Sequence, residues 1–309
     1  MLVSARRKRM RTLAQGPAAR CLLCGGARLA RVAAMLRDST RHGVVACAAC
    51  GIAQLSPLPS HADQQAFHRR DRQTTNIGRS TASDEIQRRK AWDTARRARW
   101  IAERLPAGGT VLDVGSGYGT LLSALAERGV RVTGLETSAI RRRVSAGSHQ
   151  VRVLAGDVYN LPDDLGRFDA IALVHVLEHL VDPVAAATAL RAHLQPNGLL
   201  FVETPNRDDL LLDGSDAYRC FYWQRAHVVY FTPAALDATL RRAGYAHVEL
   251  LGIQRYGIEN LMSWLVRGAP QLDAPSFETT GPYRWLERAY KAHLETSKRC
   301  DTLVAVASA

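Results

Sequence analysis

The stretch Val111-Leu-Asp-Val-Gly-Ser-Gly-Tyr-Gly119 begins as a short apolar run and ends in three alternating glycines. A short β-branched run that stops at glycine is typical of a buried parallel strand. In residues 120–128, leucine and alanine recur at helical spacing, and Gly129 follows as a stop signal. The pattern predicts a strand, a glycine turn and a helix. Such a turn lets a ligand approach bare backbone at the carboxyl end of a strand.

The spacing of these glycines separates two classes of ligand. A dinucleotide site has the pattern Gly-x-Gly-x-x-Gly, which would need a glycine where this chain has Thr120. Instead, Gly115, Gly117 and Gly119 alternate, and the first of them follows an acid, Asp113, by two residues. The arrangement resembles motif I of the class I S-adenosylmethionine-dependent methyltransferases. An acid beside the turn suits that cationic donor better than a diphosphate, which would bind the helix N-terminus. A purely structural turn is the alternative.

Acids at the ends of two further predicted strands extend this resemblance. Residues 130–136 predict a strand that ends in Glu136, whose carboxylate can accept hydrogen bonds from both ribose hydroxyls. Residues 151–157 predict the next strand. The resemblance implies that Asp157 and Val158, at the end of that strand, lie at the adenine amino group, for which a carboxylate is a suitable acceptor. An ordinary loop acid is the alternative for Asp157.

The order of the predicted elements indicates an α/β fold. Four more strands are predicted, at 168–174, 199–203, 245–253 and 302–306. The resemblance covers about residues 84–256 and returns at 300–308. It implies a Rossmann-like, doubly wound sheet of seven strands, in a methyltransferase domain at 109–309.

The strand at 168–174 runs into His175-Val-Leu-Glu-His179. This block resembles the segment after strand 4 of small-molecule methyltransferases related to the ubiquinone-pathway O-methyltransferases. The resemblance puts His175 and His179 beside the reaction centre, His175 also at the cofactor, and histidine is well suited to move a proton near neutral pH. Because the two histidines are four residues apart, they can share a helix face while Glu178 points elsewhere. A bracing role for His179 is an alternative, whereas a zinc site is discounted, because the resemblance explains the block without a metal.

Aromatic residues concentrate at 207–232. Trp223, His227 and Phe231 again resemble this methyltransferase group, in which an insertion after strand 5 covers the substrate. The segment is therefore predicted to be a lid, with a packed surface loop as the alternative, and His227 is a third candidate base. The long separation of the last two strands predicts a further insertion at 257–300, a lid or a dimer contact.

Two Cys-x-x-Cys pairs, Cys21 with Cys24 and Cys47 with Cys50, predict a structural zinc site. A two-residue gap lets two thiolates of one turn bind one metal ion. The surrounding module, residues 19–58, is too short to bury much core, so the metal would supply folding energy. Two disulfides or a redox pair are the alternatives. The module resembles one carried by some sugar C-methyltransferases and some ribosomal-RNA methyltransferases.

The net charge of +12 comes entirely from the N-terminal third of the chain. Residues 1–100 hold 20 Lys and Arg against 6 Asp and Glu, whereas the rest holds 21 against 23. Such a surface suits an anionic partner, or is only a solvated face. Residues 1–18 are expected to be a basic, disordered tail. Residues 59–108 are expected to form a linker, with a loop or a lid-like stretch at 61–83, and a helix that covers part of the cofactor site.

These signals imply an S-adenosylmethionine-dependent methyltransferase with a structural Zn²⁺. The acceptor is expected to be a hydroxyl or carbon of a small, possibly anionic metabolite, such as a nucleotide-linked sugar or a natural-product intermediate. After strand 4 the chain lacks the Asn/Asp-Pro-Pro-aromatic motif of amine-directed enzymes. An rRNA or tRNA methyltransferase whose basic module binds RNA, and a non-catalytic cofactor-binding protein, remain alternatives.

The same sequence predicts a cytoplasmic protein without a membrane partner. No apolar run approaches the roughly 20 residues that would cross a bilayer, and no apolar signal-peptide core follows the basic start. The oligomeric state is not fixed by the sequence, and a homodimer is left open.

Overall fold

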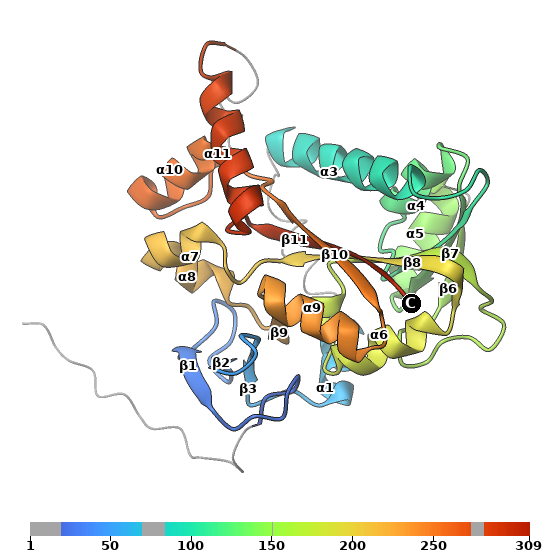
Figure 1. Cartoon of the computed structure of the whole chain (residues 1–309), viewed down its shortest axis with the longest axis horizontal. Coiled ribbons are helices and arrows are strands. Elements are labelled where there is room, and N and C mark those ends of the chain that lie inside the picture. Colours follow the sequence, from blue (N-terminus) through green and yellow to red (C-terminus); the bar gives the residue numbers. More distant parts are fainter. Residues whose placement is uncertain (1–19, 70–83, 150, 273–280) are drawn as a thin grey trace, which may run out of the picture.

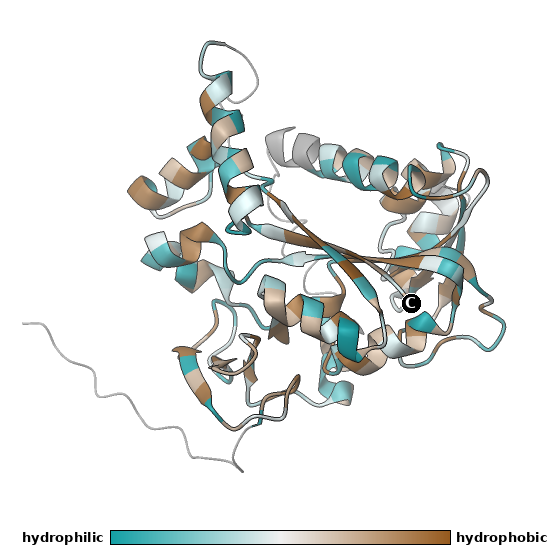
Figure 2. Ribbon diagram, viewed as in Figure 1, coloured by the Kyte–Doolittle hydropathy of each residue, from teal (hydrophilic) through white to brown (hydrophobic). Residues whose placement is uncertain are grey.

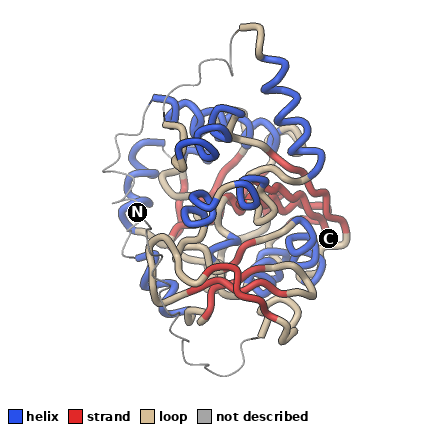
Figure 3. Tube along the Cα trace, turned by 90° about the vertical axis from the view of Figure 1, so that its left-hand side faces the viewer, coloured by secondary structure: helices blue, strands red, loops and turns tan. Residues whose placement is uncertain are grey.

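The computed structural model describes residues 20–69, 84–149, 151–272 and 281–309. The predicted basic tail at 1–18 lies outside the described residues, as do residues 70–83 of the predicted loop. The described chain contains a seven-stranded sheet and a four-stranded sheet. Figure 3 separates the strands, in red, from the helices that surround them, in blue. No helix in these ranges is both long and apolar enough to cross a membrane.

The larger sheet has the strand order β10-β11-β8-β7-β4-β5-β6. Its strands are β4 (Thr110–Val114), β5 (Arg131–Glu136), β6 (Arg152–Ala155), β7 (Phe168–Val174), β8 (Leu194–Pro205), β10 (His247–Ile253) and β11 (Thr302–Ser308). All neighbours pair in parallel except β11, which is antiparallel to both of its partners. The predicted seven-stranded α/β sheet is confirmed. Because the strand order reverses between β4 and β7, their carboxyl ends border a crevice of the kind that binds ligands.

Alternate residues of the strands face two helical layers (Figure 1). On β4, Val111 packs with the layer of α3 (Asp84–Ala102) and α4 (Thr120–Ala126), whereas Leu112 faces the opposite layer. That opposite layer contains α6 (Pro183–Arg191) and α9 (Pro233–Arg242). Because successive side chains of a strand point to opposite faces and both faces are covered by helices, both faces of a central strand are apolar. Figure 2 shows the central strands largely in brown.

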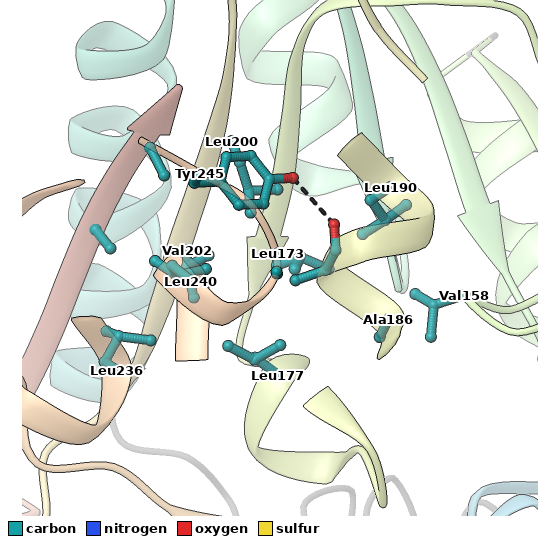
Figure 4. Packing of buried hydrophobic residues seen from close by; sticks show 14 of the residues in the cluster. Val158, Leu173, Leu177, Ala186, Leu190, Leu200, Val202, Leu236, Leu240 and Tyr245 are labelled. Carbon is teal, nitrogen blue, oxygen red and sulfur yellow. Dashed lines mark hydrogen bonds between the residues drawn. The ribbon is translucent and has the colours of Figure 1, made fainter. Parts of the chain in front are cut away.

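The core under α6 and α9 is held by one internal polar contact as well as by packing. Tyr245 is almost completely buried, and its hydroxyl donates to the carbonyl oxygen of Ala187 at 3.1 Å. Figure 4 shows this bond among the surrounding leucines and valines. A buried tyrosine needs such a partner, because an unsatisfied hydroxyl costs about 1–3 kcal/mol.

The loop alternative for residues 61–83 is wrong for its first part, because His61–Arg69 forms helix α1, whereas the lid-like alternative stays a prediction. Ser60 and Asp63 form a reciprocal cap at its start, in which each backbone amide donates to the other side chain. Gln64 then fixes the helix to the domain by donating to the carbonyl oxygens of His179 and Ala226, at 3.0 and 3.2 Å. The cap joins residues that are close in the sequence, whereas the contacts of Gln64 join distant parts of the chain.

The four-stranded sheet joins the N-terminal module to the predicted lid. Its antiparallel order is β1-β2-β3-β9, from β1 (Leu29–Ala33), β2 (Gly43–Cys47), β3 (Ala53–Ser56) and β9 (Val229–Tyr230). The last strand comes from the 207–232 segment, which also contains α7 (Leu210–Gly214) and α8 (Asp216–Tyr222). Val44 and Leu55 of the module share a buried cluster with Tyr222, Trp223 and Tyr230. The module and this segment therefore fold against each other.

The insertion between β10 and β11 contains α10 (Ile258–Arg267) and α11 (Arg284–Ser297). In Figure 1 both helices extend beyond the edge of the larger sheet, α11 above α10. Trp264 on α10 is buried against Tyr218 and Phe221 of α8, with ring centroids 5.1 Å apart in both pairs. The insertion thus contributes one wall beside the 207–232 segment.

Candidate functional site

The glycine turn requires glycine for two separate reasons. Gly115, Gly117 and Gly119 have φ angles of 70°, 58° and 79°, in the left-handed region that other residues avoid. At Gly115, a Cβ atom would also lie 2.7 Å from Cγ2 of Val176, which follows β7. The turn therefore combines strained geometry with a close approach of two strand ends, and it leaves backbone exposed at the crevice.

Two acids lie at this turn in different surroundings. The Glu136 carboxylate accepts hydrogen bonds from the backbone amides of Gly117 and Ser138, at 2.9 and 2.8 Å. Asp113 is buried, and burial together with the nearby charge of Glu136 raises its pKa to about 7. A cationic group bound at the turn would stabilise the ionised form of Asp113.

The predicted cofactor residues gather around two hollows that meet at His175. The first is lined by Gly115, Glu136, Asp157, Val158, His175 and His179 among others. The second lies between the turn and α3, and its lining includes Gly117 and His175. Neither Asp113 nor Gly119 lines these hollows; Asp113 is buried on β4, and Gly119 begins α4.

Helix α1 supplies residues that sequence reasoning missed. Gln65 donates to the Asp157 carboxylate at 2.9 Å. His68 lines the first hollow, and its ring lies edge-on to His179 at 5.3 Å between centroids. Burial and the neighbouring His179 lower the pKa of His68 to about 3, so this ring is neutral. Helix α1 therefore covers the hollow next to Asp157.

The histidine block does not form the expected helix face. His175 has a left-handed φ of 54°, and only a single 3-10 turn follows, at Leu177–His179. Glu178 does not point elsewhere: its buried Oε1 lies 3.2 Å from Nδ1 of His175 and 4.0 Å from Nε2 of His179. The expectation that Glu178 points away is wrong, because a 3-10 turn after a left-handed residue directs its carboxylate between the two rings.

Glu178 remains ionised in this cluster. Burial alone would raise its pKa, but the hydrogen bond to His175 and the charges of the surrounding histidines lower it to about 2. Burial and the neighbouring His179 lower the pKa of His227 to about 3, so His227 is neutral. The site therefore combines a buried negative charge on Glu178 with the neutral ring of His227.

The hydrogen-bond partners fix which ring nitrogens carry a proton. Nδ1 of His179 lies 2.7 Å from the carbonyl oxygen of Ala226, and a carbonyl only accepts, so Nδ1 donates and Nε2 holds the lone pair. The rings of His179 and His227 are 5.0 Å apart. Nε2 of His227 lies 2.8 Å from the amide nitrogen of Gln224, so this nitrogen of His227 accepts. His179 thus has the freer basic nitrogen of the two.

Two clusters in the described residues have ligand atoms close enough to hold a metal ion. Glu178, His179 and His227 form one of them, within 4.8 Å of one another. The four predicted cysteines form the other, Cys21, Cys24, Cys47 and Cys50.

The cysteine cluster fits zinc. Sulfur atoms are 3.5 Å apart between Cys21 and Cys50, and 3.6 Å apart between Cys24 and Cys47. A tetrahedral shell with Zn–S distances of about 2.3 Å has sulfurs about 3.8 Å apart, whereas a disulfide measures about 2.05 Å. Both turns carry a glycine in the left-handed region, Gly25 and Gly51.

Comparisons with known proteins agree with this geometry. A family model described as a methyltransferase domain matches residues 85–250. The ubiquinone biosynthesis O-methyltransferase of Pseudomonas paraeruginosa is 31% identical over 180 residues, which cover 51% of this chain and 73% of that protein. The protein of the same name from Xylella fastidiosa is 34% identical over 179 residues, covering 51% and 69%.

A solved structure supports the fold. The SAM-dependent methyltransferase from Archaeoglobus fulgidus matches with a TM-score of 0.50 at 19% identity, covering 71% of this chain and 94% of that one. The matched region contains the glycine turn, the three acids and the histidine block. The chain therefore belongs to the methyltransferase-domain family, as a class I S-adenosylmethionine-dependent methyltransferase of the small-molecule type.

Proposed function

We propose that this enzyme methylates a hydroxyl or an acidic carbon of a small metabolite, with His179 as the general base. The observation that carries the proposal is the environment of the His179 ring. Its Nδ1 proton is held by the Ala226 carbonyl, and its Nε2 lone pair remains available at the cofactor cavity. Glu178, 4.0 Å from Nε2, would stabilise the imidazolium that forms when His179 takes a proton.

The residues around the glycine turn are proposed to bind the cofactor. Glu136 would accept hydrogen bonds from the ribose hydroxyls, Asp157 with Val158 would lie at the adenine, and Asp113 would balance the donor's positive charge. His175 lines both hollows, and we propose that it contacts the cofactor where they meet. S-adenosylmethionine, when bound, supplies an already activated methyl group. The protein then has to align the acceptor, exclude water and remove a proton.

His227 and His175 are weaker candidates for the base. The accepting nitrogen of His227 is occupied by Gln224, and its pKa, lowered to about 3, makes the ring a weak base. His175 lies between two carboxylates, with Nδ1 3.2 Å from Glu178 and Nε2 3.6 Å from Glu203. Both are therefore proposed to position the acceptor and cofactor rather than to take the proton.

The class of acceptor rests on several lines of support. The relatives are named O-methyltransferases, and the amine-directed motif is missing after β7. Nucleotide-linked sugars and natural-product intermediates remain the proposed substrates. RNA is the alternative, and a non-catalytic cofactor-binding role is the second. We also propose that the four cysteines hold a structural Zn²⁺.

A screen for transfer of a labelled methyl group tests the proposal. Catechols, nucleotide sugars and RNA would be offered to the enzyme with labelled S-adenosylmethionine. His179→Ala should lower kcat by about 100- to 10,000-fold while the Kd for S-adenosylmethionine stays nearly constant. His247→Ala, on the exposed start of β10, is the matched control. Full turnover by His179→Ala would remove the proposed base, and transfer only to RNA would favour the alternative.

A further inference from the structure

A third cavity, of about 410 Å³, opens beside the histidine pair His179 and His227. Its size falls in the range of small-molecule sites, about 300–1,000 Å³. Its walls include four aromatic side chains, contributed by α8 and α10: Tyr218, Phe221, Tyr222 and Trp264. Flat apolar faces of this kind suit a ring-shaped ligand.

This cavity meets the cofactor cavity at two histidines. His227 lines the aromatic cavity and His179 lines the cofactor cavity. Their rings are 5.0 Å apart and nearly perpendicular. A hydroxyl of a ring bound among the aromatics could reach His227, whose ring adjoins that of the proposed base His179. The aromatic cavity is therefore the candidate acceptor site for the proposed function.

The four-cysteine module contributes a cation to this cavity. Arg37, between β1 and β2, lines it and donates to the carbonyl oxygen of Phe221 at 3.1 Å and to Oε1 of Gln224. The guanidinium lies over the Phe221 ring, 4.5 Å from its centroid. The amide nitrogen of the same Gln224 contacts His227. One chain of contacts therefore links the module to the histidine pair.

The charge of Arg37 is not neutralised by an ion pair within the described chain. Among the residues with described side chains, no carboxylate lies within ion-pair distance of Arg37. The next residue in the chain, Asp38, accepts a hydrogen bond from the backbone amide of Arg225. The guanidinium of Arg37 has five donors, and the contacts with Phe221 and Gln224 use two of them. The remaining donors can bind a carboxylate or phosphate in the planar geometry that arginine favours.

The methyltransferase domain contributes acids to the same cavity. Asp209, at the start of α7, accepts from the Tyr218 hydroxyl at 2.7 Å, and Asp301 precedes β11. Burial and the charge of Asp301 raise the pKa of Asp209 to about 7. Such carboxyl groups suit the hydroxyls of a ligand rather than its anion. The domain also contributes a cation, Arg255, but its guanidinium pairs with the carboxylate of Asp93 at 2.7 Å. Arg37 is therefore the cavity-lining cation without an ion pair among the described residues, and the domain adds acids.

We infer that the four-cysteine module completes the acceptor site, and that Arg37 binds an anionic group carried by a hydroxylated ring. The inference rests on the proposed function for the role of the acceptor, but the binding of the anion can be measured without methyl transfer. Carboxylate and phosphate share the chemistry that Arg37 recognises. The experiment therefore includes a ring of each kind.

Binding would be measured by calorimetry on the full chain saturated with S-adenosylhomocysteine. Two matched pairs of probes are used: catechol against 3,4-dihydroxybenzoate, and glucose against glucose 1-phosphate. In at least one pair, the anionic member should bind more tightly than its neutral partner. Arg37→Gln should weaken that anionic probe about 10- to 100-fold and leave the neutral one within about twofold.

Arg31→Gln is the matched control, because it removes the same charge from an exposed position on β1 of the same module. It should leave all four affinities unchanged. Arg37→Lys should recover part of the preference for the anion, since it keeps the charge but not the planar fork. Unchanged affinity of Arg37→Gln for S-adenosylhomocysteine shows that the variant is folded.

Three results would overturn the inference: no preference for either anion, equal weakening of the neutral and anionic probes by Arg37→Gln, or the same effect from Arg31→Gln. The proposed function fails separately. If Arg37-dependent binding of the anion is seen but no acceptor in the labelled-methyl screen is methylated, the anion site stands and the methyl-transfer proposal does not.

Discussion

At the scale of the residue, Asp113 links the cofactor site to pH. Its pKa in the folded protein is raised to about 7 by burial and by Glu136, against an ordinary value of 3.8. Between these two pH values the folded state holds a proton that the unfolded state has lost, so the free energy of unfolding falls as the pH rises. Asp113→Asn should flatten this slope, measured as thermal unfolding of the ligand-free enzyme from about pH 4 to pH 8.

The donor's positive charge favours the ionised form of Asp113, so affinity for S-adenosylmethionine should increase as the pH rises through about 7. Calorimetry across that range should show the slope in the native chain and lose it in Asp113→Asn. Asp164→Asn, at an exposed loop acid, is the control. An unchanged slope in Asp113→Asn would contradict this role.

At the scale of the element, α1 covers the side of the cavity at Asp157, where we propose that the adenine binds. Gln65 holds Asp157 at 2.9 Å, and Gln64 ties the helix to the carbonyl oxygens of His179 and Ala226. Gln65→Ala removes one hydrogen bond to a carboxylate, worth about 1.5–3 kcal/mol. It should raise the Kd for S-adenosylmethionine by about tenfold or more, chiefly through faster release in stopped-flow experiments.

Gln195→Ala, at an exposed position near the start of β8, is the control for this experiment. If Gln65→Ala released the cofactor at the native rate, α1 would be a structural helix only. A slower release would contradict the covering role altogether.

The sequence identified the elements whose signals are local. The glycine turn, Glu136 and Asp157 were predictable because apolar runs ending in glycine or acid mark the carboxyl ends of parallel strands. The contacts of Gln65 and Arg37 were not predictable, because the local pattern of residues 28–69 does not indicate which distant residues these side chains contact. The direction of Glu178 was missed for a related reason: it depends on the left-handed backbone at His175, which histidine adopts rarely.

At the scale of the whole molecule, the metal site should affect acceptor chemistry more than cofactor binding. The module pairs β3 with β9, and the Leu55 amide donates to Val228, next to His227. Removing zinc with a chelator, or Cys47→Ser, should lower kcat/KM for the acceptor by about tenfold or more. The Kd for S-adenosylmethionine should change much less, because the residues proposed to bind it lie on the larger sheet.

Elemental analysis should find one zinc per chain, reduced in Cys47→Ser and retained in the control Cys220→Ser, whose cysteine is exposed on α8. A zinc-free enzyme with native kcat/KM would show that the module has no part in catalysis.

The pairing of Ala53 with Tyr230 has a consequence for biosynthesis. β3 ends at Ser56 and its partner β9 begins at Val229, so the edge of β3 stays uncovered while about 170 further residues are synthesised. An open edge of this kind recruits other strands and promotes aggregation. The four cysteines all lie between residues 21 and 50, so the Zn²⁺ that we propose for them would bind during that interval and hold the nascent module together until its last strand arrives.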